Sequence, residues 1–131
     1  MREMKINDLT EKVIGCGIAV HKKLGPGFLE SVYQAALSSE LSKLEINHER
    51  EKAMPVQYED IVLEVGFRCD FFIENRLIVE CKAVKELRSI DLAQLLNYMK
   101  ISNVQVGLIM NFNTLKFTDG LKRLVNNYTD Q

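Results

Sequence analysis

The chain has 131 residues, of which 47% are hydrophobic and 27% are charged, and its formal net charge is −1. This length fits one domain and excludes two independent hydrophobic cores, so we expect a single domain over residues 1–131. The near-neutral charge excludes a strong overall attraction to a polyanion, so any such affinity must come from local basic clusters. No apolar run is long enough to cross a bilayer, which excludes a membrane-spanning protein.

The amino-terminal segment and the cysteines indicate where the protein works. The first twelve residues are too polar for the apolar core of a secretory signal. The three cysteines, Cys16, Cys69 and Cys81, lack the spacings of a zinc site and are odd in number, so we expect buried reduced thiols and no disulfide framework. We therefore expect a cytoplasmic protein.

Two helices are predicted at the start of the chain. Asp8 and Glu11 resemble a capping box, and apolar residues then recur at helical spacing until Gly25-Pro26 ends the pattern. A second helical pattern covers residues 29–43. The chain should therefore begin with a helical hairpin.

Strand-like sequence fills residues 46–84, where short β-rich runs are separated by residues 59–60 and 74–76. We expect three or four antiparallel strands in this region. Ser89 can cap a further helix. Its predicted buried stripe consists of Leu92, Leu95, Leu96 and Met99.

The last third of the chain contains one clear strand and one ambiguous segment. Residues 104–112 form an apolar run after a predicted helix, the connection that adds a parallel neighbour to a sheet. Residues 115–128 leave two alternatives open. Asp119-Gly120 could turn a hairpin, or residues 121–125 could begin a helix.

A charged pair interrupts the apolar run at residues 77–84. Glu80 and Lys82 are two residues apart, so a strand would present both side chains on the same face. If residues 74–76 form a three-residue loop, Ile73 pairs with Leu77 and Asp70 lies opposite Glu80. Two facing carboxylates repel each other without a cation.

Paired carboxylates of this kind are hard oxygen ligands that suit Mg²⁺, with Mn²⁺ as a substitute. Such a metal clamps a scissile phosphate and lowers the pKa of a bound water. Lys82 would position the attacking water or offset charge in the transition state. The structural alternative is a buried carboxylate–lysine ion pair or a solvated sheet face.

Polar residues on two helices strengthen the functional interpretation. Gln94 and Tyr98 are four apart and should share a helix face opposite the leucine stripe, where they could touch a phosphate or a base. Glu30 and Tyr33 share a face of the second helix, and we expect Tyr33 to bind substrate as well. Glu30 lies near that helix's N-terminus, where the helix dipole alone favours an acid.

Residues 27–33, Gly-Phe-Leu-Glu-Ser-Val-Tyr, match the GxxExxY signature. With this motif and the Asp70, Glu80 and Lys82 pattern, the chain resembles the GxxExxY protein family, which is placed within the PD-(D/E)XK nuclease superfamily. The likeness runs from the first helix to residues 122–125 and so covers nearly the whole chain.

The resemblance implies a fold and a set of site residues. The fold is α/β (α+β), a restriction-endonuclease-like core with a central mixed sheet of about four strands flanked by helices. Asp70 corresponds to the metal-binding aspartate, Glu80 and Lys82 to the (D/E)XK pair, and Glu30 to the acidic residue on the preceding helix. Gln94 and Tyr98 resemble the QxxxY element of RecB-type nucleases.

Two further residue types have alternative interpretations. Some RecB-type enzymes use a histidine before the aspartate as an extra metal ligand, and His21 could play that part, although a histidine near a helix C-terminus is also favoured by the dipole. In the register that pairs Asp70 with Glu80, Cys69 and Cys81 would face each other on the opposite side of the sheet.

The leading hypothesis is a Mg²⁺-dependent nuclease that hydrolyses phosphodiester bonds in DNA, possibly RNA. No reading module is visible, so cleavage should be weakly sequence-specific or directed by a partner protein, and a homodimer is plausible. The alternative is a non-catalytic nucleic-acid-binding or protein-interaction module on the same fold. Asp70, Glu80 and Lys82 argue against it, because such a module has no chemical reason to keep buried charges.

Overall fold

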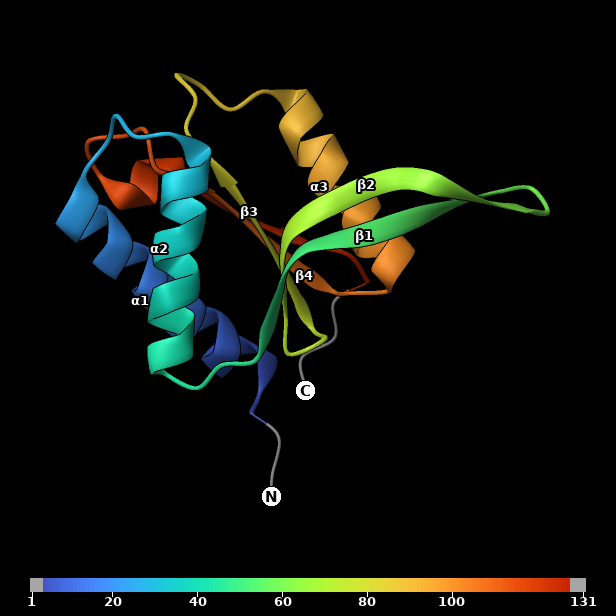
Figure 1. The fold of residues 1–131 in the computed structure, drawn as a ribbon, viewed down its shortest axis with the longest axis horizontal. Helices are drawn as coiled ribbons and strands as arrows, with labels where there is room; N and C mark the ends of the chain where they lie inside the picture. Colours follow the sequence, from blue (N-terminus) through green and yellow to red (C-terminus); the bar gives the residue numbers. More distant parts are fainter. Residues whose placement is uncertain (1–3, 128–131) are drawn as a thin grey trace.

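The computed structural model describes residues 4–127 and consists of a mixed five-stranded sheet between helices (Figure 1). The elements in chain order are α1 (Ile6–Leu24), α2 (Glu30–Lys43), β1 (His48–Tyr58), β2 (Ile61–Ile73), β3 (Leu77–Lys82), α3 (Ser89–Ser102), β4 (Val106–Asn111), the 3₁₀ helix η1 (Phe117–Gly120) and β5 (Leu121–Val125). The spatial order of the strands is β1-β2-β3-β4-β5. Only β3 and β4 are parallel, and the other pairs are antiparallel.

Two hydrophobic clusters lie on opposite faces of the sheet. One joins α1 and α2 to side chains such as Val79 and Leu108. The other joins α3 to side chains such as Ile78 and Ile109. Since successive residues of a strand point to opposite faces, both faces of the central strands are covered by helices. Figure 1 shows α1 and α2 on one side of the sheet and α3 on the other.

The central strands owe their position to their sequence. Every residue of β4 is buried, and in β3 only Lys82 is partly exposed. Continuous apolar runs of this kind are typical of strands that are covered on both faces. Glu80 and Lys82 therefore lie on a strand that helices cover on both faces.

The β1–β2 hairpin continues past the rest of the sheet as a long ribbon (Figure 1). Its pairing shifts in register between Met54 and Val56. At this irregularity a Cβ on Gly66 would lie 1.9 Å from the Met54 carbonyl oxygen, so only glycine fits. Near the turn Tyr58 and Ile61 are exposed, which shows that the outer part of the ribbon has no helix against it.

Most of the predicted elements are confirmed. The helical hairpin, the three antiparallel strands within residues 46–84 and the crossover from β3 through α3 to a parallel β4 are all present. The fold is mixed α/β, as the resemblance implied, with five strands where about four were expected. Within residues 4–127 no helix combines the length and apolarity needed to cross a membrane.

Two local predictions, both about helix caps, are wrong. Asp8 does not cap α1, which begins at Ile6 with Lys5 as its N-cap. Ser89 is the first residue of α3, and the N-cap position is occupied by Arg88. The Asp91 carboxylate accepts the Arg88 N–H at 2.9 Å and so satisfies the backbone at the start of the helix. Of the two alternatives left open for residues 115–128, the structure excludes the helix: residues 121–125 form a strand paired antiparallel with β4, and Asp119-Gly120 lies in the connection η1. The end of the ambiguous segment, at residue 128, lies outside the described residues.

Two glycines provide a matched test of the packing. An alanine at Gly120 would put its Cβ 2.0 Å from the Asn111 carbonyl oxygen, whereas nothing lies within 4 Å of a Cβ at Gly15. We expect Gly120→Ala to lower the free energy of unfolding by about 1–3 kcal/mol, because the backbone must shift. Gly15→Ala should raise it by about 0.5–1 kcal/mol, because alanine favours the helix interior of α1. Urea denaturation measures both; equal effects would contradict the packing described.

Candidate active site

The backbone pairing of β2 with β3 gives way to side-chain hydrogen bonds at Asp70 and Glu80. The ladder runs from Ile73 opposite Leu77 to Phe71 opposite Val79, which confirms the predicted register. At the next position the Asp70 N–H donates to Glu80 Oε2 at 2.7 Å, and the Cys81 N–H donates to Asp70 Oδ2 at 2.8 Å. Each carboxylate is thus held by the backbone of the other strand.

Lys82 lies on the same sheet face as Glu80. Ile78 belongs to the cluster under α3, and Cys81 belongs to the cluster under α1 and α2, so alternation turns Glu80 and Lys82 toward α3. This confirms the prediction that they share a face. The Lys82 ammonium lies 3.9 Å from Asp91 Oδ1, and each of these two side chains is 20% exposed.

Burial and like charge disfavour ionisation of both carboxyl groups. Burial, followed by the charges of Glu51 and Glu30, raises the pKa of Asp70 to about 6 against the opposing effects of the Cys81 N–H and Lys82. Burial, followed by the Asp70 charge, raises the pKa of Glu80 to about 8. The pair therefore resists carrying two negative charges, although backbone donors and a lysine oppose the effect.

Glu51 is a further acidic residue of this region, and sequence reasoning missed it. In β1, Arg50 pairs with Phe71 and Lys52 pairs with Cys69, so Glu51 lies across from Asp70. Its φ of 53° is in the left-handed region, which is uncommon for such a residue in a strand. Its carboxylate accepts a hydrogen bond from Gln34 Nε2 at 3.0 Å.

Gln34 links this part of β1 to α2. Its side chain is 8% exposed. Besides donating to Glu51, it accepts hydrogen bonds from two nitrogens of Arg50, at 3.0 and 3.3 Å. The signal that could have found it is its place in the second helix, one turn after Glu30.

Glu30 is the first residue of α2, and its Oε2 accepts the N–H of Ala83 at 3.3 Å. Ala83 directly follows Lys82, so this contact sets the start of α2 against the end of β3. The structure thus brings Glu30 to the end of the strand that carries Glu80 and Lys82.

Tyr33 has a structural role in place of the expected substrate contact. Its side chain is fully buried, and its ring stacks on Phe112 with centroids 4.6 Å apart. Its hydroxyl donates to the Gly25 carbonyl oxygen at 2.5 Å and accepts the Phe28 N–H at 3.1 Å. Tyr33 therefore holds the loop between α1 and α2, and no surface remains for a substrate.

Tyr98 lies on the buried face of α3, which corrects the prediction that it lies opposite the leucine stripe. It is 3% exposed and packs in one cluster with Leu95 and Met99, with its ring edge to face with Phe67. Burial, followed by the charges of Glu80 and Asp70, raises the pKa of the Tyr98 phenol, and the ring packs in the same cluster as Cys69, the neighbour of Asp70. Gln94 is one turn earlier on α3 and partly exposed.

The histidine and the cysteines lie as follows. His21 Nε2 is 2.7 Å from the Thr114 carbonyl oxygen, and the ring packs near Phe117.

The three cysteines are free and buried, as predicted. Cys69 and Cys81 do not share a face, because β2 loses its regular alternation at Asp70; Cys69 joins the α3 cluster and Cys81 joins the other.

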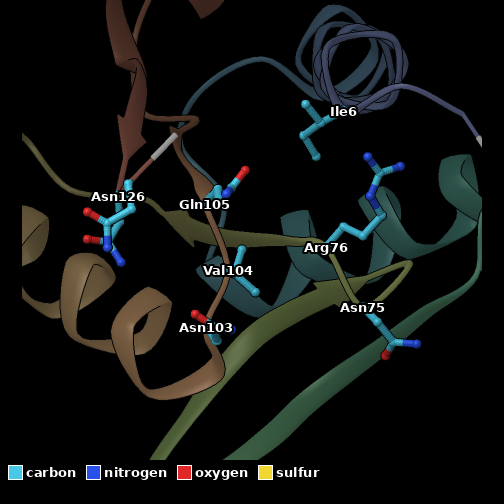
Figure 2. Close-up of a pocket in the computed structure, with 8 residues that line it drawn as sticks. Ile6, Asn75, Arg76, Asn103, Val104, Gln105 and Asn126 are labelled. Carbon is cyan, nitrogen blue, oxygen red and sulfur yellow. The ribbon is translucent and has the colours of Figure 1, made fainter. Parts of the chain in front are cut away.

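A hollow of about 270 Å³ lies near the N-terminal ends of β3 and β4, away from Glu80 and Lys82 (Figure 2). Its lining residues are Ile6, Asn75, Arg76, Asn103, Val104, Gln105, Asn126 and Asn127. None of the predicted site residues lines it. The Arg76 guanidinium already donates to the Met4 carbonyl oxygen. The predicted chemistry thus gathers at the other end of these strands.

The carboxylates fit a hard divalent cation as a pair. Among residues 4–127 no group of three or more His, Cys, Asp or Glu side chains has the arrangement of a metal site. Asp70 and Glu80 each use one oxygen in the backbone hydrogen bonds described above, and their second oxygens take no part in those bonds. One or two carboxylates, completed by water and phosphate oxygens, are the usual protein ligands of Mg²⁺.

The raised pKa values predict how stability depends on pH without metal. The ordinary values are 3.8 for Asp70 and 4.5 for Glu80, against about 6 and about 8 in the folded protein. For each group, at a pH between its ordinary pKa and its raised pKa, the folded state binds more protons than the unfolded state. The free energy of unfolding is therefore greatest below the ordinary pKa values and falls as the pH rises toward the raised ones. The slope should approach about 1.4 kcal/mol per pH unit for each linked proton.

Urea denaturation in a chelator across this pH range measures that slope. Glu80→Gln should flatten it, because glutamine still accepts the Asp70 N–H and carries no charge. Glu11→Gln, at an exposed position of α1, is the matched control and should leave it unchanged. Equal slopes for wild type and Glu80→Gln would rule out strain at the carboxylate pair.

The comparison with protein families agrees with this geometry. A model described as the PD-(D/E)XK nuclease superfamily matches residues 7–124, which include Asp70, Glu80 and Lys82. Neither the curated proteins nor the solved structures gave a significant match. Since the family model covers most of the chain, the protein belongs to the PD-(D/E)XK nuclease superfamily.

Proposed function

We propose that this protein is a Mg²⁺-dependent nuclease that hydrolyses phosphodiester bonds in DNA. The observation that carries the proposal is the carboxylate pair at the end of the β2–β3 ladder, with Lys82 on the same face. A purely structural ion pair would place the Lys82 ammonium against the carboxylate of Asp70 or Glu80. Here the described ion pair of Lys82 is with Asp91.

Asp70 and Glu80 are the residues that would hold the cation, for which Mn²⁺ is a chemical substitute. When bound, the cation supplies charge to the scissile phosphate and lowers the pKa of a coordinated water. The strained carboxylate pair favours cation binding, because the positive charge relieves both the repulsion and the cost of burial.

Lys82 serves the reacting phosphate. Its side chain is 20% exposed, and its 3.9 Å separation from Asp91 leaves the ammonium able to donate to a phosphoryl oxygen or to the attacking water. A fixed positive charge in a largely buried site stabilises the charge that develops in the transition state. Asp91, held by its hydrogen bond to the Arg88 N–H, positions the ammonium.

The surrounding residues have supporting roles in this proposal. Glu30, held by the Ala83 N–H, assists the cation through water, and Gln94 contacts the nucleic acid from the partly exposed side of α3. Tyr98 forms the wall behind the carboxylates. A metal-ligand role for His21 would require it to leave the Thr114 carbonyl oxygen. Placement in the GxxExxY family stays a prediction from residues 27–33.

Three variants and one control test the proposal. With Mg²⁺ and labelled DNA, Asp70→Asn and Glu80→Gln should lose both metal binding and cleavage. Lys82→Met should keep metal binding by calorimetry but lower the cleavage rate by about 10²–10³-fold, because only transition-state charge stabilisation is removed. Asp119→Asn, at an exposed position of η1, should behave as wild type.

The contrary outcomes are distinct. Folded wild-type protein that binds neither Mg²⁺ nor Mn²⁺ and cuts neither DNA nor RNA would identify a non-catalytic module. Cleavage that persists in Asp70→Asn would place the active centre elsewhere. Cleavage of RNA alone would leave the metal centre standing and overturn the choice of DNA.

A further inference from the structure

A groove of about 750 Å³ lies between the β1–β2 ribbon and the C-terminal end of α3. Met54, Val62 and Phe72 line it from the ribbon, and Ile101 lines it from α3. The lining residues come from these two elements, which form the walls of the groove, and Figure 1 shows the ribbon crossing α3. The groove is large enough for a small organic ligand and has a partly apolar lining.

The charged side chains at the groove are both positive. Lys52 comes from β1 and Lys100 from the last turn of α3, and no aspartate or glutamate lines the groove. The Lys52 ammonium lies 5.4 Å from the centre of the Phe72 ring. Lys52 also forms an ion pair with Glu49 at 3.3 Å, and the Glu49 side chain is 57% exposed. The two lysines still outnumber this one acid, and the remaining positive charge favours an anionic ligand.

The groove begins beside the candidate active site. Lys52 pairs with Cys69, the neighbour of Asp70. Phe72 is two residues from Asp70 on β2, about 7 Å along the strand. Phe72 and Ile78 pack in the cluster under α3, the face toward which Glu80 and Lys82 also point. The β1–β2 ribbon therefore connects the groove with the strand position of Asp70.

We propose that this groove binds a single-stranded segment of nucleic acid adjoining the bond that is cut, with Lys52 and Lys100 contacting phosphates. The inference rests on the proposed nuclease function and narrows its substrate class. In a duplex the faces of the bases stack on one another, whereas unpaired bases can lie on exposed apolar side chains such as Val62 and Ile101. The preferred substrate then contains an overhang, a flap or a free single strand.

Salt-dependent binding tests the two lysines. Wild-type protein in a chelator is titrated with fluorescent oligothymidylate, and the affinity is measured by anisotropy at several salt concentrations. Each lysine–phosphate contact to a single strand contributes about 0.7 to the slope of log affinity against log salt. The double variant Lys52→Gln/Lys100→Gln should reduce the slope by about 1.4, and Lys100→Gln alone should reduce it by about 0.7.

The control is Lys5→Gln/Lys12→Gln, which removes the same charge from two exposed lysines at α1, on the other side of the sheet. It should leave the slope unchanged. Equal slopes in the groove variants and wild type, an equal loss in the control, or binding of a blunt duplex as tight as that of the single strand would each overturn the inference. Thermal melts verify that every variant folds, and the exposed Lys100→Gln provides the test if the double variant does not.

Cleavage assays with Mg²⁺ on the same proteins separate this inference from the proposed function. If wild-type protein cleaves DNA and the lysine variants show an unchanged salt slope, the groove is not the binding site but the proposed nuclease function stands. A reduced slope without any cleavage supports the groove as a nucleic-acid site and overturns the proposed hydrolysis.

Discussion

The exchange of backbone hydrogen bonds for carboxylate hydrogen bonds at Asp70 and Glu80 is the constraint on which the rest of the site depends. Each strand donates one N–H to the carboxylate of the other strand, and these hydrogen bonds hold the two carboxylates in place. Burial and mutual repulsion oppose the ionisation of both groups there. A hydrogen bond to a charged acceptor is stronger than a neutral one, and here it offsets part of that cost. In the proposed function, a divalent cation would offset much of the remaining cost.

The surrounding elements converge on the same end of β3. Glu30 ties the start of α2 to Ala83, and Asp91 ties the start of α3 to the neighbourhood of Lys82. Asn111, at the end of β4, accepts from and donates to the backbone of Val84 and is itself 2% exposed. The segment after Lys82 is therefore fixed from three sides, so rigid elements, and not a mobile loop, position the charged groups.

Local rules of spacing predicted the relative placement of Asp70, Glu80 and Lys82 but not the residues around them. The period of a strand places Glu80 beside Lys82, and a three-residue loop sets Asp70 across from Glu80. Regular pairing counted from the turn at residues 59–60 would place Glu51 opposite Arg68, so the sequence does not predict Glu51 near Asp70. The register shift between Met54 and Val56 places it opposite Asp70. Tyr33 and Tyr98 were expected to face substrate, but tertiary packing buries both rings and leaves only their hydroxyls for polar contacts.

The most direct measurement of the central claim is carbon NMR of the side-chain carboxyl groups during a Mg²⁺ titration. If Asp70 and Glu80 hold one cation between them, their carboxyl signals shift together at the same metal concentration, while the signal of exposed Asp119 does not respond. Independent responses, or a response of only one of the two acids, would contradict a shared metal centre at the end of the β2–β3 ladder.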